Sequence, residues 1–388
     1  MRVAILLAVE SCEHFFDDQL GLTPDEYVDG YRNDWAWDWC EALRRDGVEA
    51  IVYVPSLRER GLRPTPDGFA VRFVPLGRAY EPWARAPVLK RSPLGRYAAQ
   101  AAGTAAMLRP LRAALGADRV DALLVQEYLT ARFDLLPGRV GVPVVGVEQG
   151  MRDKREVKWL KRRSLPRAAT VVTQTSYQAD KVRRYGGRAQ HLPNGVDTSF
   201  FAPDPAVSPD PATIVCAARL HDTQKRISDL IRAVAELGGP WRLSLLGRGP
   251  DEEEFRALAA SLGVADRVEF AGFIEDKAEV RDRLRRATVF ALPSRFEGLP
   301  VALLEAMSCG APAVGTSIPA IAEVIEDGVS GRLVPLADPA ALAAAIAGVA
   351  SDRPRYSAAA RERVERSFSL DRLGRGLHAV LRGATRAQ

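Results

Sequence analysis

Short apolar runs alternate with amphipathic stretches along most of this 388-residue chain. Apolar runs rich in β-branched residues include 2–9, 121–128 and 213–220, whereas residues 176–186 and 227–238 have the spacing of amphipathic helices. Apolar strands that alternate with helices are typical of parallel sheets covered on both faces. The pattern therefore predicts an α/β protein.

The alternation is interrupted at residues 201–212, where prolines stand at positions 203, 205, 209 and 211. Proline lacks a backbone N–H and continues neither a helix nor a central strand, so we expect a linker here. The chain is also too long for one ordinary core. We predict an N-terminal α/β domain over 1–200 and the linker over 201–212. A C-terminal α/β domain over 213–366 and a helix over 367–388 that packs toward the N-terminal domain complete the prediction.

The composition is that of a globular protein, with 47% hydrophobic and 27% charged residues. No apolar run approaches the roughly 20 residues that span a bilayer. The apolar stretch at the N-terminus is short and runs into acidic residues, which favours a buried strand over a signal peptide. The four cysteines, Cys12, Cys40, Cys216 and Cys309, are far apart, which argues against a zinc site or a disulfide framework. We expect a cytoplasmic protein.

The formal net charge of +5 is mild, but residues 152–167 hold eight basic and two acidic residues. We favour a solvent-exposed loop and helix here, because Trp159 and Leu160 form only a small apolar face. A weak contact with an anionic membrane surface or a phosphorylated acceptor is the alternative. Nucleic-acid binding is not expected, since no aromatic interleaving or known module is visible.

The segment 294–310, SRFEGLPVALLEAMSCG, carries the most chemistry. Gly298 permits a close backbone approach, and Pro300 suits the first position of a helix. The N–H groups around Gly298 and Leu299 would favour an anion or sugar hydroxyls at the helix N-terminus. Glu297 precedes this helix, and Glu305 lies inside it in an apolar context unusual for a solvent-facing acid. Carboxylates accept hydrogen bonds from hydroxyls, so the combination indicates a sugar nucleotide.

This segment resembles the signature of the family 4 retaining glycosyltransferases, which have the GT-B fold of two facing Rossmann-like domains. Residues 191–197, 218–237, 245–274 and 315–334 are similar to further family segments, in the right order. The resemblance implies that residues 1–200 form a Rossmann-like acceptor-binding domain and residues 213–366 a Rossmann-like sugar-nucleotide-binding domain. It implies that Glu297 contacts donor-sugar hydroxyls and Glu305 the nucleotide ribose. It also implies that Arg219 and Lys225 hold the donor diphosphate, and it adds four residues to the donor site: Phe296, Gly298, Leu299 and Gly247. The loop before Lys225 is one residue longer than is usual, and Arg226 stands where the family often has glycine, so either cation could reach the phosphate.

The first half departs from the family pattern. A glycine-rich turn is common after the first strand, but here the chain reads AVESCEHFF. Positions that often hold histidine near the transferred sugar are Gln126 and Gln149, and glutamine cannot shuttle a proton. We take five residues as acceptor-side candidates: His14, Glu13, Gln126, Glu127 and Gln149. A lone histidine is more often structural than catalytic, which also applies to His14.

The resemblance implies a retaining glycosyltransferase that moves a hexose or amino-hexose from a nucleoside-diphosphate sugar to a hydroxyl acceptor. The acceptor classes left open are a small natural product, an aminocyclitol, a lipid and a glycan. We expect no metal or other cofactor, because no Asp-x-Asp motif follows an apolar strand and Arg219 and Lys225 would neutralise the diphosphate. The alternatives are another GT-B enzyme, such as an epimerase or phosphorylase, and a non-catalytic sugar-nucleotide-binding partner.

Overall fold

The computed structural model describes residues 1–8, 10–17, 21–32, 35–77, 80, 92–149 and 158–386. They form two compact units. The first comprises Met1–Pro193 together with Leu373–Gln388, and the second comprises Asn194–Arg372. The proline-rich segment 201–212 thus lies within the second unit, and residues 373–388 belong to the first.

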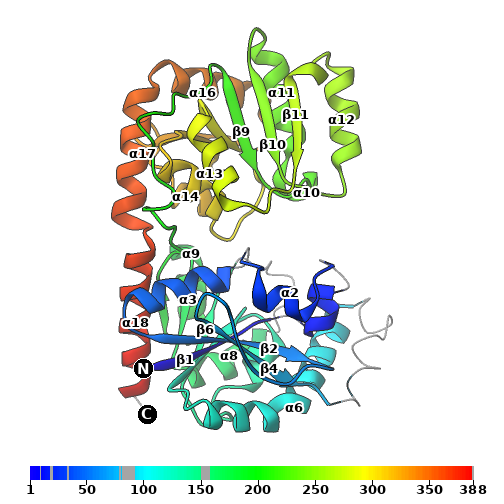
Figure 1. Ribbon diagram of the computed structural model, residues 1–388, viewed down its shortest axis with the longest axis vertical. Helices are drawn as coiled ribbons and strands as arrows, with labels where there is room; N and C mark the ends of the chain where they lie inside the picture. Colours follow the sequence, from blue (N-terminus) through cyan, green and yellow to red (C-terminus); the bar gives the residue numbers. More distant parts are fainter. Residues whose placement is uncertain are drawn as a thin grey trace. The chain divides into compact units, whose positions relative to one another are not determined.

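The first unit contains a sheet flanked by helices (Figure 1). Its strands are β1 (Arg2–Leu6), β2 (Glu49–Ser56), β3 (Gly61–Pro64), β4 (Ala70–Pro75), β5 (Ala122–Gln126), β6 (Val144–Val147), β7 (Thr170–Thr173) and β8 (Ala189–His191). Its helices are α2 (Pro24–Asp29), α3 (Trp35–Arg45), α6 (Pro93–Ala117), α7 (Ala131–Leu135), α8 (Lys158–Ser164) and α9 (Ser176–Arg184), and most of α18 (Leu370–Arg386). Short helical turns lie at η1 (Glu13–Asp17) and η4 (Leu165–Arg167).

The strand order of this sheet in the described residues is β3-β4-β2-β1-β5-β6-β7-β8, and only the β3–β4 pair is antiparallel. Alternate residues of β1, β2 and β5, such as Ala4 and Leu6 of β1, pack with Leu111 of α6 in one core. Helix α3 covers the other face of the sheet, beside α18 (Figure 1). The order reverses between β1 and β5, so the chain segments that follow these two strands leave the sheet at a topological switch point.

The second unit is also a sheet between helices. Its strands are β9 (Thr213–Ala217), β10 (Arg242–Leu246), β11 (Val268–Gly272), β12 (Val289–Leu292), β13 (Ala313–Thr316) and β14 (Gly331–Val334). Its helices are α10 (Asp222–Lys225), α11 (Ile227–Leu237), α12 (Glu252–Ser261), α13 (Lys277–Arg286), α14 (Val301–Ser308), α15 (Pro319–Ala322), α16 (Pro339–Ser351) and α17 (Arg353–Ser367), with a short turn at η5 (Ala265–Arg267).

All pairings of this second sheet are parallel, and its order is β11-β10-β9-β12-β13-β14. This is the order of a Rossmann-type sheet, with its switch point between β9 and β12. The strands are nearly continuous apolar runs, as parallel strands buried on both faces require. The predicted α/β class is therefore confirmed, with one Rossmann-like sheet in each unit.

Two further observations bear on the predictions from the sequence. In the part of the chain that the structure describes, no helix combines the length and the apolar character needed to cross a membrane. The four cysteines are all buried and form no disulfide.

Candidate functional site

The switch point of the second sheet brings together the two segments that the sequence singled out. Lys225 lies at the end of α10, in the connection that follows β9, and Glu297 lies in the loop that follows β12. Because β9 and β12 are parallel neighbours, both connections leave the sheet at the same edge. Ligands of open α/β sheets bind in this position, outside the carboxyl ends of the strands.

Three hydrogen bonds fasten these two connections to each other. The Arg295 backbone N–H donates to the Gln224 carbonyl at 2.7 Å, and the Gln224 side chain donates to the Phe296 carbonyl at 3.3 Å. The Lys225 ammonium donates to the Glu297 carboxylate at 2.6 Å. These bonds within the protein hold the loop after β12 against α10.

The Lys225–Glu297 pair is largely removed from solvent, since the side chains are 14% and 7% exposed. A lysine ammonium has three N–H donors, and Glu297 takes one of them. The second carboxylate oxygen of Glu297 accepts no hydrogen bond from the described residues. The pair therefore offers ammonium donors and a carboxylate acceptor to a ligand that carries both negative charge and hydroxyl groups.

The start of α14 adds backbone donors beside this pair. The helix begins at Val301 with Pro300 as its N-cap residue, one position later than the sequence predicted. The backbone N–H groups of Gly298 and Leu299 donate no hydrogen bond within the described part of the chain. Glu305 lies in the second turn of α14 and is half-buried. These positions are consistent with a ligand at the helix N-terminus.

The other two candidate cations differ in their surroundings. Arg219 is exposed, and its guanidinium forms no ion pair with the described residues. Arg226 has a left-handed backbone, with φ of 49°, and its guanidinium donates to Asp229 at 2.8 Å. Both neighbouring cations are therefore paired, but Lys225 pairs with Glu297 of the loop after β12, whereas Arg226 pairs with Asp229 of the adjoining helix α11. Lys225 is thus the cation that lies against the loop after β12.

The candidate Gly247 and its neighbour Gly249 fit the loop after β10 against the loop after β9. A Cβ atom on Gly247 would lie 2.0 Å from the Ala218 carbonyl oxygen, and one on Gly249 would lie 2.1 Å from the Leu220 carbonyl oxygen. No side chain fits at such distances. The sequence assigned Gly247 to the donor site but gave Gly249 no role, although the spacing Gly-Arg-Gly after an apolar strand was visible.

The thiol of Cys216 lies in β9 behind this site. Burial raises the pKa of Cys216 to about 12, and the charges of Lys225 and Glu297 act on it in opposite directions. The thiol is therefore neutral at physiological pH and is unsuited to act as a nucleophile.

In the first unit, two acceptor-side candidates have structural partners at the carboxyl edge of the sheet. The Gln126 side chain accepts a hydrogen bond from the Ala8 backbone N–H at 2.7 Å, so it ties the end of β5 to the end of β1. The Glu13 carboxylate is buried and accepts hydrogen bonds from Ser56, Leu57 and Arg58. Burial alone would raise the pKa of Glu13, but these hydrogen bonds outweigh it and hold the pKa below its usual value.

The remaining acceptor-side candidates lie near the same edge of the first sheet. His14 is half-exposed in η1, and its Nε2 lies 3.6 Å from Glu10. Glu127 is buried and has a left-handed backbone with φ of 61°, a conformation that costs a residue with a side chain about 1–2 kcal/mol. Gln149 lies just past β6 and is partly buried. Glu127 is thus an acidic residue with a strained backbone at the switch point of the first sheet, between β1 and β5.

The basic segment falls partly outside the described residues, which begin again at Lys158. Trp159 is 60% exposed, and Lys158, Arg162 and Arg163 of α8 are exposed as well. Lys161 is fully buried instead, and its ammonium donates to the Tyr128 carbonyl at 2.6 Å and to the Asp134 carboxylate at 2.8 Å. One member of the segment is therefore a core residue that fixes α8 against the loop after β5.

Together, the two Rossmann-like units define an architecture of the GT-B type, with a charged site at the switch point of the second sheet. Residues 35–195 match the family model described as glycosyl transferase 4-like domain, and residues 211–352 match the model described as glycosyl transferases group 1. The chain belongs to this family, group 1 or family 4 of the glycosyltransferases, as the sequence predicted.

Individual relatives agree with this assignment. A putative colanic acid biosynthesis glycosyltransferase of Escherichia coli is 37% identical over 202 residues, which cover 48% of this chain and 49% of the relative. The chain thus matches about half the length of this curated relative. Among solved structures, sucrose-phosphate synthase of Thermosynechococcus elongatus has a TM-score of 0.76 at 18% identity, with 100% of both chains covered. The HepE protein of Anabaena, solved in complex with UDP, has a TM-score of 0.71 at 16% identity and covers 98% of this chain and 100% of its own.

Proposed function

We propose that the chain is a retaining glycosyltransferase that transfers a hexose or amino-hexose from a nucleoside-diphosphate sugar to a hydroxyl acceptor. The observation that carries this proposal is the pairing of Lys225 with Glu297 at the switch point of the second sheet, beside the N–H groups of Gly298 and Leu299. UDP in the Anabaena neighbour supports the nucleotide class of the donor.

In this proposal the donor diphosphate lies against Lys225 and Arg219, and the donor sugar lies against Glu297. The bond between the anomeric carbon and the diphosphate oxygen breaks, and a new bond forms between that carbon and the acceptor oxygen. The two cations neutralise the negative charge that develops on the leaving diphosphate. They would serve in place of a metal ion, which makes transfer independent of added divalent cations.

The proton of the acceptor hydroxyl has to leave as the new bond forms. Gln126 and Gln149 cannot accept it, because an amide is not basic. We assign this role to the departing diphosphate on the same face of the sugar, which preserves the anomeric configuration. Glu127 is the side chain we assign to the acceptor hydroxyl as a positioning contact.

The test is incubation of the full chain with a panel of nucleotide sugars and candidate acceptors, followed by determination of the product anomer. The proposal predicts nucleoside-diphosphate release only in the presence of an acceptor, and a product with the anomeric configuration of the donor. Release without an acceptor would favour an epimerase or a hydrolytic activity. An inverted product would contradict the retaining mechanism, and tight donor binding without any turnover would favour a non-catalytic partner.

A further inference from the structure

A cavity lies in the first unit, at the edge of the sheet opposite to the antiparallel strand β3. It has a volume of about 460 Å³ and lies between strands β7 and β8 and helix α18. Its walls are Ala169, Thr170, Arg188, Gln190, His191, Leu192, Gly376, Ala379, Val380, Gly383 and Ala384. Strand β1, whose carboxyl end borders the candidate acceptor side, lies four strands away from β8.

The cavity exists because the face of α18 that covers these strands carries small side chains. Gly376, Ala379, Val380, Gly383 and Ala384 follow one another at helical spacing and form one stripe. At one end the stripe is closed, since a Cβ atom on Gly376 would lie 2.5 Å from Leu192. At Gly383 a Cβ atom would meet nothing within 4 Å, so the space there is open.

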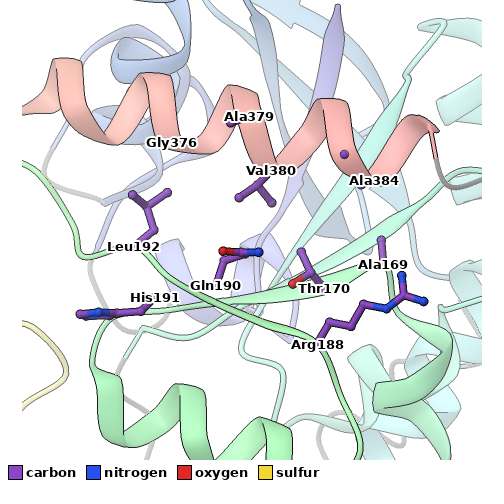
Figure 2. A pocket seen from close by; sticks show the side chains of 11 residues that line it. Ala169, Thr170, Arg188, Gln190, His191, Leu192, Gly376, Ala379, Val380 and Ala384 are labelled. Atoms are coloured by element: carbon purple, nitrogen blue, oxygen red, sulfur yellow. The ribbon is translucent and has the colours of Figure 1, made fainter.

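Polar groups without partners lie at the open end of this apolar space. Thr170 is 8% exposed, and its buried hydroxyl has no hydrogen-bond partner in the described chain. The β7–β8 pairing places Arg188 next to Thr170, and its exposed guanidinium forms no ion pair with a described residue. Figure 2 shows Thr170 and Gln190 extending from the strands toward α18, with Arg188 running past Thr170. Buried polar groups normally form a hydrogen bond, so we expect the Thr170 hydroxyl to form one with a bound ligand.

The two ends of the cavity therefore differ in chemistry. Leu192 and Val380 supply apolar side chains at one end, where the Gln190 side chain also lies, whereas Thr170 and Arg188 provide a hydroxyl and a cation at the other end. A volume of this size is within the range of small-molecule sites, and such sites combine apolar walls with a few polar groups that orient the ligand. We propose that this cavity binds an amphiphile with an aliphatic body and one anionic head group, held by Arg188 and Thr170. This site is independent of the proposed transferase function.

The test is isothermal titration calorimetry of the full chain with decanoate, with decanol as the uncharged probe. We expect saturable one-to-one binding of decanoate. Gly383→Leu should abolish this binding because its side chain occupies the open space, whereas Gly348→Leu, on the exposed and open side of α16, should leave it unchanged. Thermal unfolding of both variants checks that the chain is folded.

The head-group assignment is tested separately. Arg188→Gln should weaken decanoate roughly tenfold, the size of one charge-assisted hydrogen bond, and should not change decanol binding. Arg184→Gln, which removes an exposed charge at the end of α9 outside the cavity lining, is the matched control. Thr170→Val should also weaken decanoate without lowering the melting temperature, since the hydroxyl has no partner to lose. Absence of saturable decanoate binding, or equal binding by wild type and Gly383→Leu, would overturn the proposal.

Discussion

The ammonium nitrogen of Lys225 lies 2.6 Å from a carboxylate oxygen of Glu297, although the two residues are 72 positions apart in the sequence. The contact follows from the sheet order, because strands β9 and β12 are neighbours in space with two other strands between them in the chain. It joins a cation suited to phosphate with an acceptor suited to hydroxyls. Each of these two functions can be tested by substitution.

Replacement of Glu297 should mainly slow transfer. The carboxylate is assigned to the donor sugar, so Glu297→Ala should lower kcat by about 10²–10³, the size of a lost transition-state contact. Donor affinity should change less, because Lys225 and Arg219 remain. Steady-state kinetics give both quantities, with Glu254→Ala on the exposed surface of α12 as the control. A large rise in KM at constant kcat would instead place Glu297 in ground-state binding only.

Replacement of Glu305 should act on donor binding. The residue is half-buried in the second turn of α14 and is assigned to the nucleotide ribose. Loss of a hydrogen bond to a charged group weakens binding roughly 10- to 100-fold, so Glu305→Ala should raise the donor Kd by this factor. Calorimetric titration with the nucleotide alone measures it. If nucleotide affinity is unchanged, the ribose assignment fails.

A methyl group added to Gly249, in the loop after β10, should lower activity. Gly249→Ala places its Cβ atom against the Leu220 carbonyl oxygen, so the loop that carries Arg219 has to move. A displacement of about 1 Å at a binding site can cost up to a hundredfold, and we expect kcat/KM to fall roughly ten- to a hundredfold. Gly348→Ala is the matched control, because it lies in helix α16 with open space around its Cβ position. That control should stabilise the chain by about 0.5–1 kcal/mol.

Glu13 should make the stability of the first unit depend on pH. Its pKa in the folded chain lies below its usual value, so its ionised form contributes stability above the unfolded-state pKa of about 4.3. This contribution is lost as the pH falls through the lower pKa of the folded state. Urea unfolding should therefore show Glu13→Gln less stable than wild type at pH 7, with the difference shrinking at pH 3. A pH-independent difference would rule out the ionised carboxylate as its source.

Removal of one charge from the buried Lys161–Asp134 ion pair should strongly lower the free energy of unfolding. Its side chains are 0% and 3% exposed, so Lys161→Met leaves a buried carboxylate without its cation. Such changes destabilise proteins by about 3–5 kcal/mol. The double variant Lys161→Met with Asp134→Leu should recover much of this loss, as judged by denaturant unfolding. Additive losses in the double variant would show that the two charges do not interact.

Much of the fold, and the two segments that meet at the switch point of the second sheet, could be predicted from the sequence. The alternation of apolar runs and amphipathic stretches is a local signal, and it predicted both Rossmann-like sheets. The segment around Glu297 carries its chemistry within a few residues, so the pattern was readable without a structure. The resemblance to the family predicted that Lys225 binds the donor diphosphate. The sequence alone left Arg226 as an equal candidate for this contact. The structure separates them by their partners, because Lys225 pairs with Glu297 of the loop after β12, whereas Arg226 pairs with Asp229 of the adjoining helix α11.

What the sequence did not predict depends on contacts between distant segments. The bond from Gln224 to the Phe296 carbonyl joins two loops that come together only through the sheet order. Lys161 looks like its exposed neighbours in a basic segment, and only the position of Asp134 explains its burial. The cavity beside α18 could not be predicted from the sequence either. It forms because the small residues of α18 face strands β7 and β8, which are distant from α18 in the sequence.

The most direct test of the central claim is the binding of a panel of nucleotide sugars to the full chain and to its Lys225→Ala variant. The account predicts saturable binding of at least one nucleoside-diphosphate sugar by the wild type, weakened at least tenfold in the variant. Wild-type chain that binds no member of the panel, or a variant that binds with unchanged affinity, would contradict it.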